Sequence, residues 1–160
     1  MTKTNKKPLK PSTLTHWLAV GFGSGLAPKA PGTFGTIAAL PIVWAMSYLS
    51  LYGFLAVTLV SCVVGIYLCG KTAEDFNYHD HPGIVWDEFA GMMITMIAVP
   101  MTWQYLLAGF ILFRIFDILK PWPISWLDKH VDGGFGIMID DILAGLMALG
   151  CMHLGMMWLN

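Results

Sequence analysis

Five long apolar segments, separated by short polar breaks, dominate the hydrophobic pattern of the chain. Each holds about four to five helical turns, and two of them carry charged residues near one end. A 16-residue helix is about 24 Å long, somewhat less than the roughly 30 Å hydrocarbon core of a bilayer. The segments therefore fit short tilted spans, spans in a thinned bilayer, or the buried helices of a very apolar soluble bundle. They cover residues 37–52, 54–69, 84–99, 103–119 and 142–159.

The positions of the charges favour the membrane. If the lysine-rich start of the chain is cytoplasmic and each segment crosses once, the turns around Gly53 and Pro100 and the terminal Asn160 lie outside. None of these three places carries a charge, so all nine basic and ten acidic residues lie inside. This distribution obeys the positive-inside rule. A soluble bundle has no physical reason to remove charge from both opposite turns.

The predicted fold is therefore all-α: a helical membrane bundle of about five apolar helices, four to five of them transmembrane, with a glycine-rich N-terminal loop. Residues 1–13 are expected to form a basic cytoplasmic tail, and residues 14–160 a single helical domain. The composition agrees, because 56% of the residues are hydrophobic and 12% charged, against roughly a quarter charged in soluble proteins. A net charge of −1 argues against a nucleic-acid partner, which requires a basic face. No pattern sets an oligomeric state.

Two polar segments on the inner side repeat one motif. Residues 83–91 read Gly-Ile-Val-Trp-Asp-Glu-Phe-Ala-Gly, and residues 136–145 read Gly-Ile-Met-Ile-Asp-Asp-Ile-Leu-Ala-Gly. Each motif places two adjacent acids at the expected start of an apolar helix, where the helix dipole favours carboxylates. One acid would suffice as a cap, so the repeated pair favours a shared cation site, and the closing glycines clear space for another backbone or a ligand. The acids are Asp87, Glu88, Asp140 and Asp141.

A third polar segment carries charges at helical spacing. Arg114, Asp117 and Lys120 recur every three residues just before Pro121, so they lie on one face of a helix. They form an ion-pair ladder, a phosphate site or both, with Arg114 and Lys120 as phosphate clamps and Asp117 as a metal ligand. Oxygen ligands beside a phosphate select a hard cation, and Mg²⁺ is the expected ion.

The histidines give no comparable signal. His79 and His81 flank Asp80 in a triplet that resembles a zinc motif, but no third ligand has the matching spacing. We therefore interpret the triplet as a solvated loop. The isolated histidines, which receive no role, are His16, His130 and His153.

The glycine-rich stretch over residues 21–35 is a candidate anion cradle. Backbone amides freed by glycine can form an anion-binding nest, although the stretch lacks the Gly-Lys-Ser/Thr end of a nucleotide P-loop. Because it lies on the same face as the acids, it fits a phosphate or a glycerol headgroup. The predicted phosphate- or headgroup-binding residues are Ser24, Gly25, Gly32, Thr33 and Lys120.

Together these residues resemble the phosphatidylglycerophosphatase A family of bacterial membrane lipid phosphatases. The resemblance covers residues 21–145 without a departure inside the matching blocks. The blocks are Gly-Phe-Gly-Ser-Gly at 21–25, Ala-Pro-Gly-Thr-Phe-Gly at 30–35, Asp-Glu-Phe-Ala-Gly at 87–91, Phe-Arg-Ile-Phe-Asp-Ile-Leu-Lys-Pro-Trp-Pro at 113–123, and residues 133–145. It implies a multi-pass inner-membrane enzyme that uses Mg²⁺ to convert phosphatidylglycerophosphate, its phospholipid substrate, to phosphatidylglycerol at the cytoplasmic face.

The mechanism expected from these residues is metal-assisted hydrolysis among membrane lipids. Lys120, with Arg114 behind it, would offset charge as the bond to glycerol breaks, and Asp141 would accept the proton of the attacking water. Asp128 is either a further ligand or a surface partner of Lys129, and a covalent aspartyl-phosphate is the rival route. The expected ligands of one or two Mg²⁺ ions, which would bind the phosphate and activate the water, are Asp87, Glu88, Asp117, Asp140 and Asp141.

Two other functions fit parts of the pattern. A broader lipid phosphatase would act on phosphatidate or lysophosphatidate with the same residues. A non-enzymatic membrane protein, such as a channel or an assembly factor, would use the acids only to bind a cation. The absence of ionisable residues from the middle of the apolar segments argues against an ion conduction path.

Overall fold

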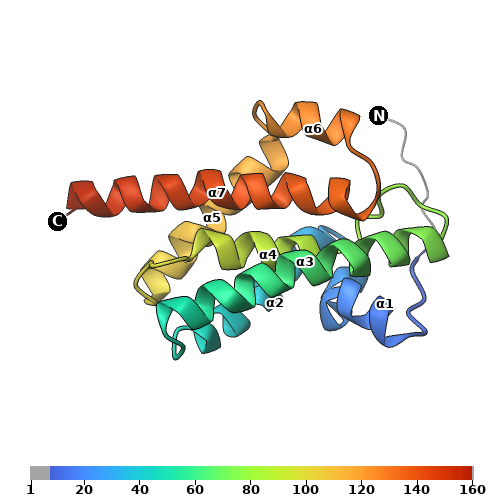
Figure 1. The fold of residues 1–160 in the computed structure, drawn as a ribbon, viewed down its shortest axis with the longest axis horizontal. Coiled ribbons are helices and arrows are strands. Elements are labelled where there is room, and N and C mark those ends of the chain that lie inside the picture. The colour runs from blue at the N-terminus through green and yellow to red at the C-terminus, as the bar shows by residue number, and fades with distance from the viewer. Residues whose placement is uncertain (1–7, 160) are drawn as a thin grey trace.

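The computed structural model describes residues 8–159, which are helical with short connections (Figure 1). The described range contains no β-strand, which confirms the all-α prediction. Part of the predicted basic tail, residues 1–7, lies outside the described residues. The elements are α1 (Leu14–Ala19), a 3₁₀ helix η1 (Gly21–Leu26), α2 (Pro31–Met46), α3 (Leu51–Asp75), α4 (Trp86–Thr95), α5 (Trp103–Leu119), α6 (Ile124–His130) and α7 (Gly133–Leu159).

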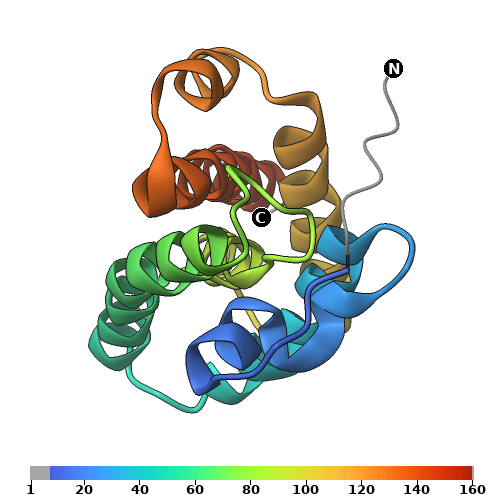
Figure 2. The same ribbon diagram turned by 90° about the vertical axis from the view of Figure 1, so that its right-hand side faces the viewer.

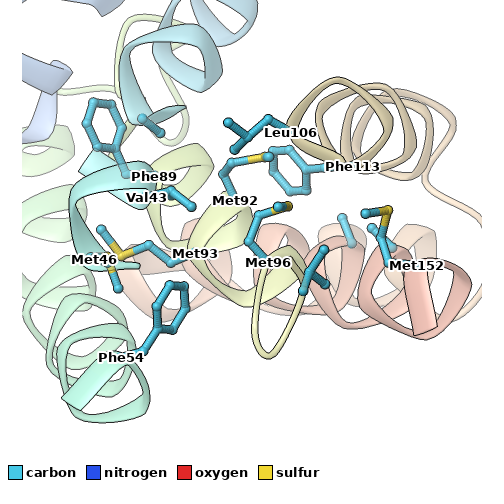
Figure 3. Close-up of a cluster of buried hydrophobic side chains, with 14 of the residues drawn as sticks. Val43, Met46, Phe54, Phe89, Met92, Met93, Met96, Leu106, Phe113 and Met152 are labelled. Atoms are coloured by element: carbon cyan, nitrogen blue, oxygen red, sulfur yellow. The ribbon is translucent and has the colours of Figure 1, made fainter. Parts of the chain in front are cut away.

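The short helix α4 is the centre of the bundle. It packs against α2, α3, α5 and α7, and every residue from Glu88 to Thr95 is buried. Its methionines and Phe89 form much of the main core together with Val43 of α2 and Phe113 of α5 (Figure 3). Because the surrounding helices alternate in direction, the N-terminal ends of α4 and α7 and the C-terminal ends of α3 and α5 meet at one end of the bundle (Figures 1 and 2).

The closing glycines of the repeated motif bring α4 and α7 into backbone contact. A Cβ atom on Gly91 would lie 2.4 Å from Phe113 Cε2 and 2.9 Å from the carbonyl oxygen of Asp141, and one on Gly145 would lie 2.6 Å from the carbonyl oxygen of Gly91. Small residues allow helix backbones to approach in this way. The two motifs therefore form one helix crossing, and their acids are held at the same end of it.

Substitution of Gly91 by alanine is expected to destabilise the fold by about 2 kcal/mol, because a buried methyl group must displace Phe113 or α7. Thermal unfolding in detergent would measure this effect. The matched control is Gly150→Ala, since nothing lies within 4 Å of its Cβ position. This control should leave stability unchanged or raise it slightly. Equal melting temperatures for all three proteins would contradict the close α4–α7 crossing.

The prediction of four to five transmembrane helices is wrong by length. In the described range, α3 with 25 residues and α7 with 27 are the two helices long and apolar enough to cross a bilayer. The segment 84–99 forms a helix of only 10 residues, because α4 ends at Thr95 before the turn that leads to Pro100. The helices α2 and α5, with 16 and 17 residues, are also shorter.

Apolar side chains nevertheless cover much of the outside of the bundle. Leu59, Val60 and Val63 of α3 are 60–66% exposed, and Leu154 and Trp158 of α7 are 60% and 89% exposed. Single exposed apolar residues are common on soluble proteins, whereas continuous rows indicate an apolar surrounding or a partner. The exterior is therefore consistent with lipid contact along α3 and α7.

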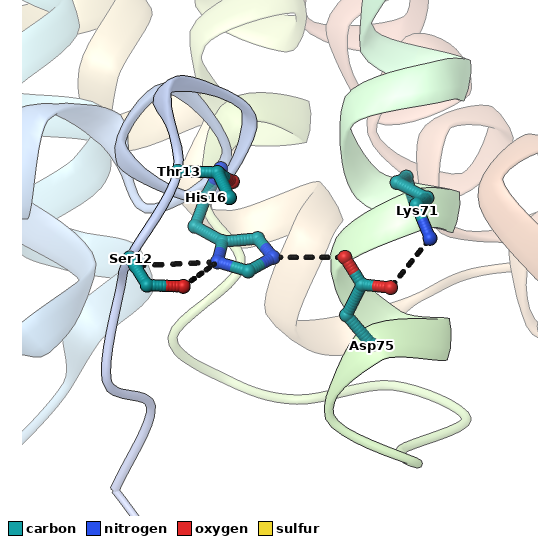
Figure 4. A network of polar contacts seen from close by, with 5 residues as sticks. All are labelled: Ser12, Thr13, His16, Lys71 and Asp75. Carbon is teal, nitrogen blue, oxygen red and sulfur yellow. Dashed lines mark hydrogen bonds and ion pairs between the residues drawn. The ribbon is translucent and has the colours of Figure 1, made fainter.

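A polar network centred on the buried His16 side chain joins α1 to the end of α3 (Figure 4). The backbone N–H of Ser12 donates to Nδ1 of His16 at 3.3 Å, so Nδ1 is the acceptor and Nε2 carries the proton. Nε2 donates to Asp75 at 3.0 Å, and Lys71 binds the other carboxylate oxygen at 2.5 Å. His16, which the sequence left without a role, thus anchors the N-terminal helix to α3.

Candidate active site

The charged end of the bundle contains a cavity of about 530 Å³. Its wall is formed by residues from the starts of α2, α4 and α7, the loop before α4, the end of α5 and the α6 segment. The two acid-pair motifs, the Arg114–Lys120 segment and the end of the glycine-rich stretch therefore meet at one cavity. The charged residues of the wall are Asp80, Asp87, Glu88, Arg114, Asp117, Lys120, Asp128, Asp140 and Asp141.

Three buried carboxylates form the floor of this site. Asp87, Glu88 and Asp141 each offer an oxygen atom, and these atoms all lie within 4.8 Å of one another. One oxygen of each carboxylate, Asp87 Oδ1, Glu88 Oε2 and Asp141 Oδ2, is buried without a hydrogen-bond partner. Buried like charges without partners are costly. A bound cation would satisfy all three at once, so this cluster is the part of the site that fits a metal ion.

Asp117 and Asp140, the other two predicted ligands, lie in the same cavity but already contact cationic side chains. Arg114 Nη1 pairs with Asp117, its neighbour one turn along α5, and lies 3.8 Å from Glu88 Oε1. Lys120 Nζ lies 3.1 Å from Asp140 Oδ2. Asp140 keeps its Oδ1 atom buried and unpartnered, as Arg114 keeps its Nε atom. Arg114 and Lys120 thus neutralise Asp117 and Asp140, whereas the Asp87–Glu88–Asp141 cluster is left with unpartnered oxygens.

Lys120 does not extend the Arg114–Asp117 pair into the predicted ladder. It follows the last residue of α5 in a left-handed conformation, with φ of 45°, and its side chain lies between Asp140 and Asp128, which it contacts at 2.7 Å. Burial lowers the pKa of Lys120, but hydrogen bonds to Asp128 and Asp140 outweigh it and raise the pKa above its ordinary value. Lys120 therefore stays cationic.

Asp128 belongs to the site and not to the surface pair with Lys129 that the sequence allowed. It lines the cavity from α6 and binds Lys120. Burial raises its pKa, but the hydrogen bonds with Lys120 and Asp140 outweigh that effect and hold the pKa below its ordinary value. Asp128 is thus an anion that positions Lys120.

Of the glycine-rich stretch, only Gly32 among the predicted binding residues reaches the cavity. A Cβ atom on Gly32 would lie 2.4 Å from Glu88 Oε1 and 3.2 Å from Arg114 Nη1. Thr33 lies in the first turn of α2 and does not line the cavity. Ser24 donates to the carbonyl of Gly21 at 2.7 Å, and Gly25 packs against Gly83, whose carbonyl oxygen would lie 2.1 Å from an added Cβ.

Sequence reasoning gave no role to His79 and Asp80 in the loop before α4. His79 and Asp80 line the cavity, and His79 Nε2 also pairs with Asp132 beside the start of α7. The triplet was interpreted as a solvated loop. His79 is indeed exposed, but it also lies at the edge of the cavity. Its place shortly before the Asp87–Glu88 pair was the available signal.

The described residues thus form an apolar helical bundle with three buried carboxylates and two cationic side chains around one cavity at its end, an arrangement suited to a charged ligand. A family model described as Phosphatidylglycerophosphatase A matches residues 17–156. The chain therefore belongs to the phosphatidylglycerophosphatase A family, as the resemblance implied.

Individual relatives agree over most of their length. The phosphatidylglycerophosphatase A of Escherichia coli (strain K12) is 51% identical over 149 residues, which are 92% of this chain and 87% of its own. That of Haemophilus influenzae (strain ATCC 51907 / DSM 11121 / KW20 / Rd) is 50% identical over 151 residues, 91% of this chain and 93% of its own. A Bacteroides thetaiotaomicron protein, whose name proposes a phosphatidylinositol-3-phosphatase, is 38% identical over 146 residues, 86% of this chain and 90% of its own. No solved structure matches the chain.

Proposed function

We propose that this protein hydrolyses the terminal phosphomonoester of phosphatidylglycerophosphate with the help of Mg²⁺, at the cytoplasmic face of a bacterial inner membrane. The observation that carries the proposal is the buried Asp87–Glu88–Asp141 cluster beside Arg114 and Lys120 in one cavity. A phosphate dianion needs cationic partners on several sides, and the site offers two cationic side chains and a place for a metal. Membership of the family supports the choice of lipid.

The residues fit a Mg²⁺ ion. The cluster is made of carboxylates, which this hard cation prefers, and its unpartnered oxygens are buried. Asp87, Glu88 and Asp141 would hold the ion, and Asp140 and Asp117, which line the same cavity, would bind it or its water ligands. When bound, Mg²⁺ would act as a Lewis acid that offsets the charge of the phosphate.

The chain's own side chains would divide the remaining chemistry. Arg114, whose Nε atom is buried without a partner, would bind a phosphate oxygen, and Lys120 would lie beside the ester oxygen. Asp141 would accept a proton from the attacking water as its oxygen joins the phosphorus atom. As the bond from phosphorus to the glycerol oxygen breaks, the ammonium of Lys120 would stabilise the negative charge there until a solvent proton arrives.

The orientation proposed for the protein follows from the ends of the helices. The cavity and the charged side chains of the described residues lie at one end of the bundle, and the turns after α2 and after α4 carry no charge. Basic residues mark the cytoplasmic side of membrane proteins. The site would thus lie near the headgroups of the inner leaflet, where a phosphate on a lipid is within reach.

Replacement of Lys120 by alanine is expected to lower kcat by about 10²- to 10³-fold, because one preorganised charge beside the leaving oxygen is lost. Phosphate release from phosphatidylglycerophosphate in detergent would measure the change. Lys129→Ala is the matched control, since Lys129 is exposed on α6 and does not line the cavity, and it should retain full activity. Equal activity of the two variants would remove Lys120 from the mechanism.

A further inference from the structure

An exposed apolar row runs along α5 and ends at the cavity. Leu107, Ile111, Ile115 and Ile118 are 43–65% exposed, and their spacing of three and four residues places them on one side of the helix. Ile118 also lines the cavity, so it belongs to both surfaces. The apolar outside of α5 and the charged inside of the site are thus continuous through this one residue.

Arg114 belongs to the same side of the helix. It lies seven residues from Leu107, three from Ile111 and four from Ile118, the separations at which helical side chains stack above one another. Seen from Arg114, Leu107 and Ile111 extend away from the charged end of the bundle. A lipid whose phosphate contacts Arg114 would therefore find its hydrocarbon chains beside this row.

The length of the row matches one leaflet. The eleven steps from Leu107 to Ile118 rise about 16 Å along the helix, close to half of the roughly 30 Å hydrocarbon core. Beyond Ile118, Leu119 and Trp122 are 72% and 77% exposed. Tryptophan is enriched at the level of the headgroups, so Trp122 marks the depth at which the row would leave the hydrocarbon.

We propose that the row Leu107, Ile111, Ile115 and Ile118, hereafter the α5 row, binds the acyl chains of the phospholipid substrate, which enters the cavity sideways from the bilayer past Ile118. This inference rests on the proposed function and adds to it the path of the lipid. The substrate need not leave the membrane, because its chains stay on the outside of α5 while its headgroup reaches Arg114 and the carboxylate cluster. Shape and packing select the chains here, since lipid offers no hydrophobic driving force.

The test is photolabelling with a phosphonate analogue of phosphatidylglycerophosphate, in which a methylene replaces the ester oxygen of the terminal phosphate and one acyl chain carries a diazirine. A phosphatidylcholine with the same diazirine chain reports ordinary lipid contact. The matched surface is the outer side of α3 around Leu59, Val60 and Val63, which is at least as exposed but contributes no residue to the cavity lining. Labelled peptides are counted by mass spectrometry in nanodiscs.

The phosphonate lipid is expected to label the α5 row severalfold more than the α3 surface, whereas phosphatidylcholine labels both alike. Equal labelling of both surfaces by both lipids would overturn the proposal. Phosphate release by the same preparation tests the proposed function separately. If the protein is active but labelling is unselective, only the role of the α5 row is excluded. If the protein is inactive but labelling is selective, only the proposed reaction is excluded.

A substitution on the row gives a second readout. Ile115→Ser is expected to raise KM for a long-chain substrate about fivefold without a change in kcat, because packing contacts to a chain are lost. Hydrolysis of a dihexanoyl substrate, whose chains are too short to follow the row, should not change. Val60→Ser on α3 is the control and should leave both substrates unaffected. An equal KM change for the short and long lipids would contradict an acyl-chain role.

Discussion

The Asp141→Asn variant should release phosphate at least about 10³-fold more slowly than the wild-type protein, because it loses both a metal ligand and the proposed proton acceptor. The same variant should melt no lower than the metal-free wild type. Asp141 lies among buried carboxylates, and its Oδ2 atom has no partner, so the neutral amide removes like-charge repulsion from the fold. A loss of activity with no loss of stability is expected for an acid that acts in catalysis and not in folding.

The control for Asp141 is Glu74→Gln, which neutralises an exposed acid in the last turn of α3 outside the cavity. This variant should keep its activity and its melting temperature. Phosphate release and thermal unfolding should be measured on both variants in the same detergent. Activity of Asp141→Asn within tenfold of wild type would exclude the proposed role, and a large loss of stability would reclassify the residue as structural.

Withdrawal of divalent cations should abolish turnover, and Mg²⁺ should restore it. Mg²⁺ should also stabilise the fold, since it would neutralise three crowded carboxylates. At a concentration 100 times its Kd, a ligand that binds only the folded state adds about 2.7 kcal/mol to the free energy of unfolding. A melting curve recorded with and without Mg²⁺ measures this effect in the absence of substrate.

The matched comparison for the metal is the Asp141→Asn variant. Its melting temperature should respond to Mg²⁺ much less than that of the wild type, because one of the three buried ligands is neutral. An equal shift in both proteins would place the ion elsewhere. Full activity of chelator-treated wild-type protein would contradict metal-assisted hydrolysis.

The arrangement of charges was predictable because it depends on chain order alone. Alternating helices must bring every second connection to the same end, so the charge-free turns and the paired acids of the two motifs were sufficient to place Asp87, Glu88 and Asp141 together. The glycine that follows each acid pair was correctly expected to admit a neighbour. The sequence could not predict that Gly145 packs against the backbone of Gly91. A close backbone contact and a bound ligand both require a small residue, so the glycines fit either alternative.

The helix boundaries were less predictable because tertiary contacts override local propensity. Asp140 and Asp141 were expected at the start of their helix, yet α7 begins at Gly133, so both acids lie two turns inside it. The reason is packing: a Cβ atom on Gly134 would lie 1.9 Å from the carbonyl oxygen of Ile66 in α3. Gly25 is likewise used for contact with Gly83 and not for an anion, which explains why most of the predicted cradle misses the site.

Lys120 shows the same limit at the level of one side chain. Its spacing from Arg114 and Asp117 assumed a continuous helix, but α5 ends at Leu119 because Pro121 cannot continue it. The left-handed residue at the helix end redirects the ammonium towards Asp128 and Asp140. Lys120 was correctly predicted to lie with the acids, but its partners Asp128 and Asp140 were not predicted.

Phosphate release from three lipids by the purified protein, measured with Mg²⁺ and with excess chelator, tests the proposed function. The lipids are phosphatidylglycerophosphate, phosphatidate and phosphatidylinositol 3-phosphate. The proposed function predicts rapid release from the first lipid only, and only with Mg²⁺. Comparable release from all three lipids would support a phosphatase but contradict the proposed substrate. No release from a folded, monodisperse sample would contradict an enzymatic function.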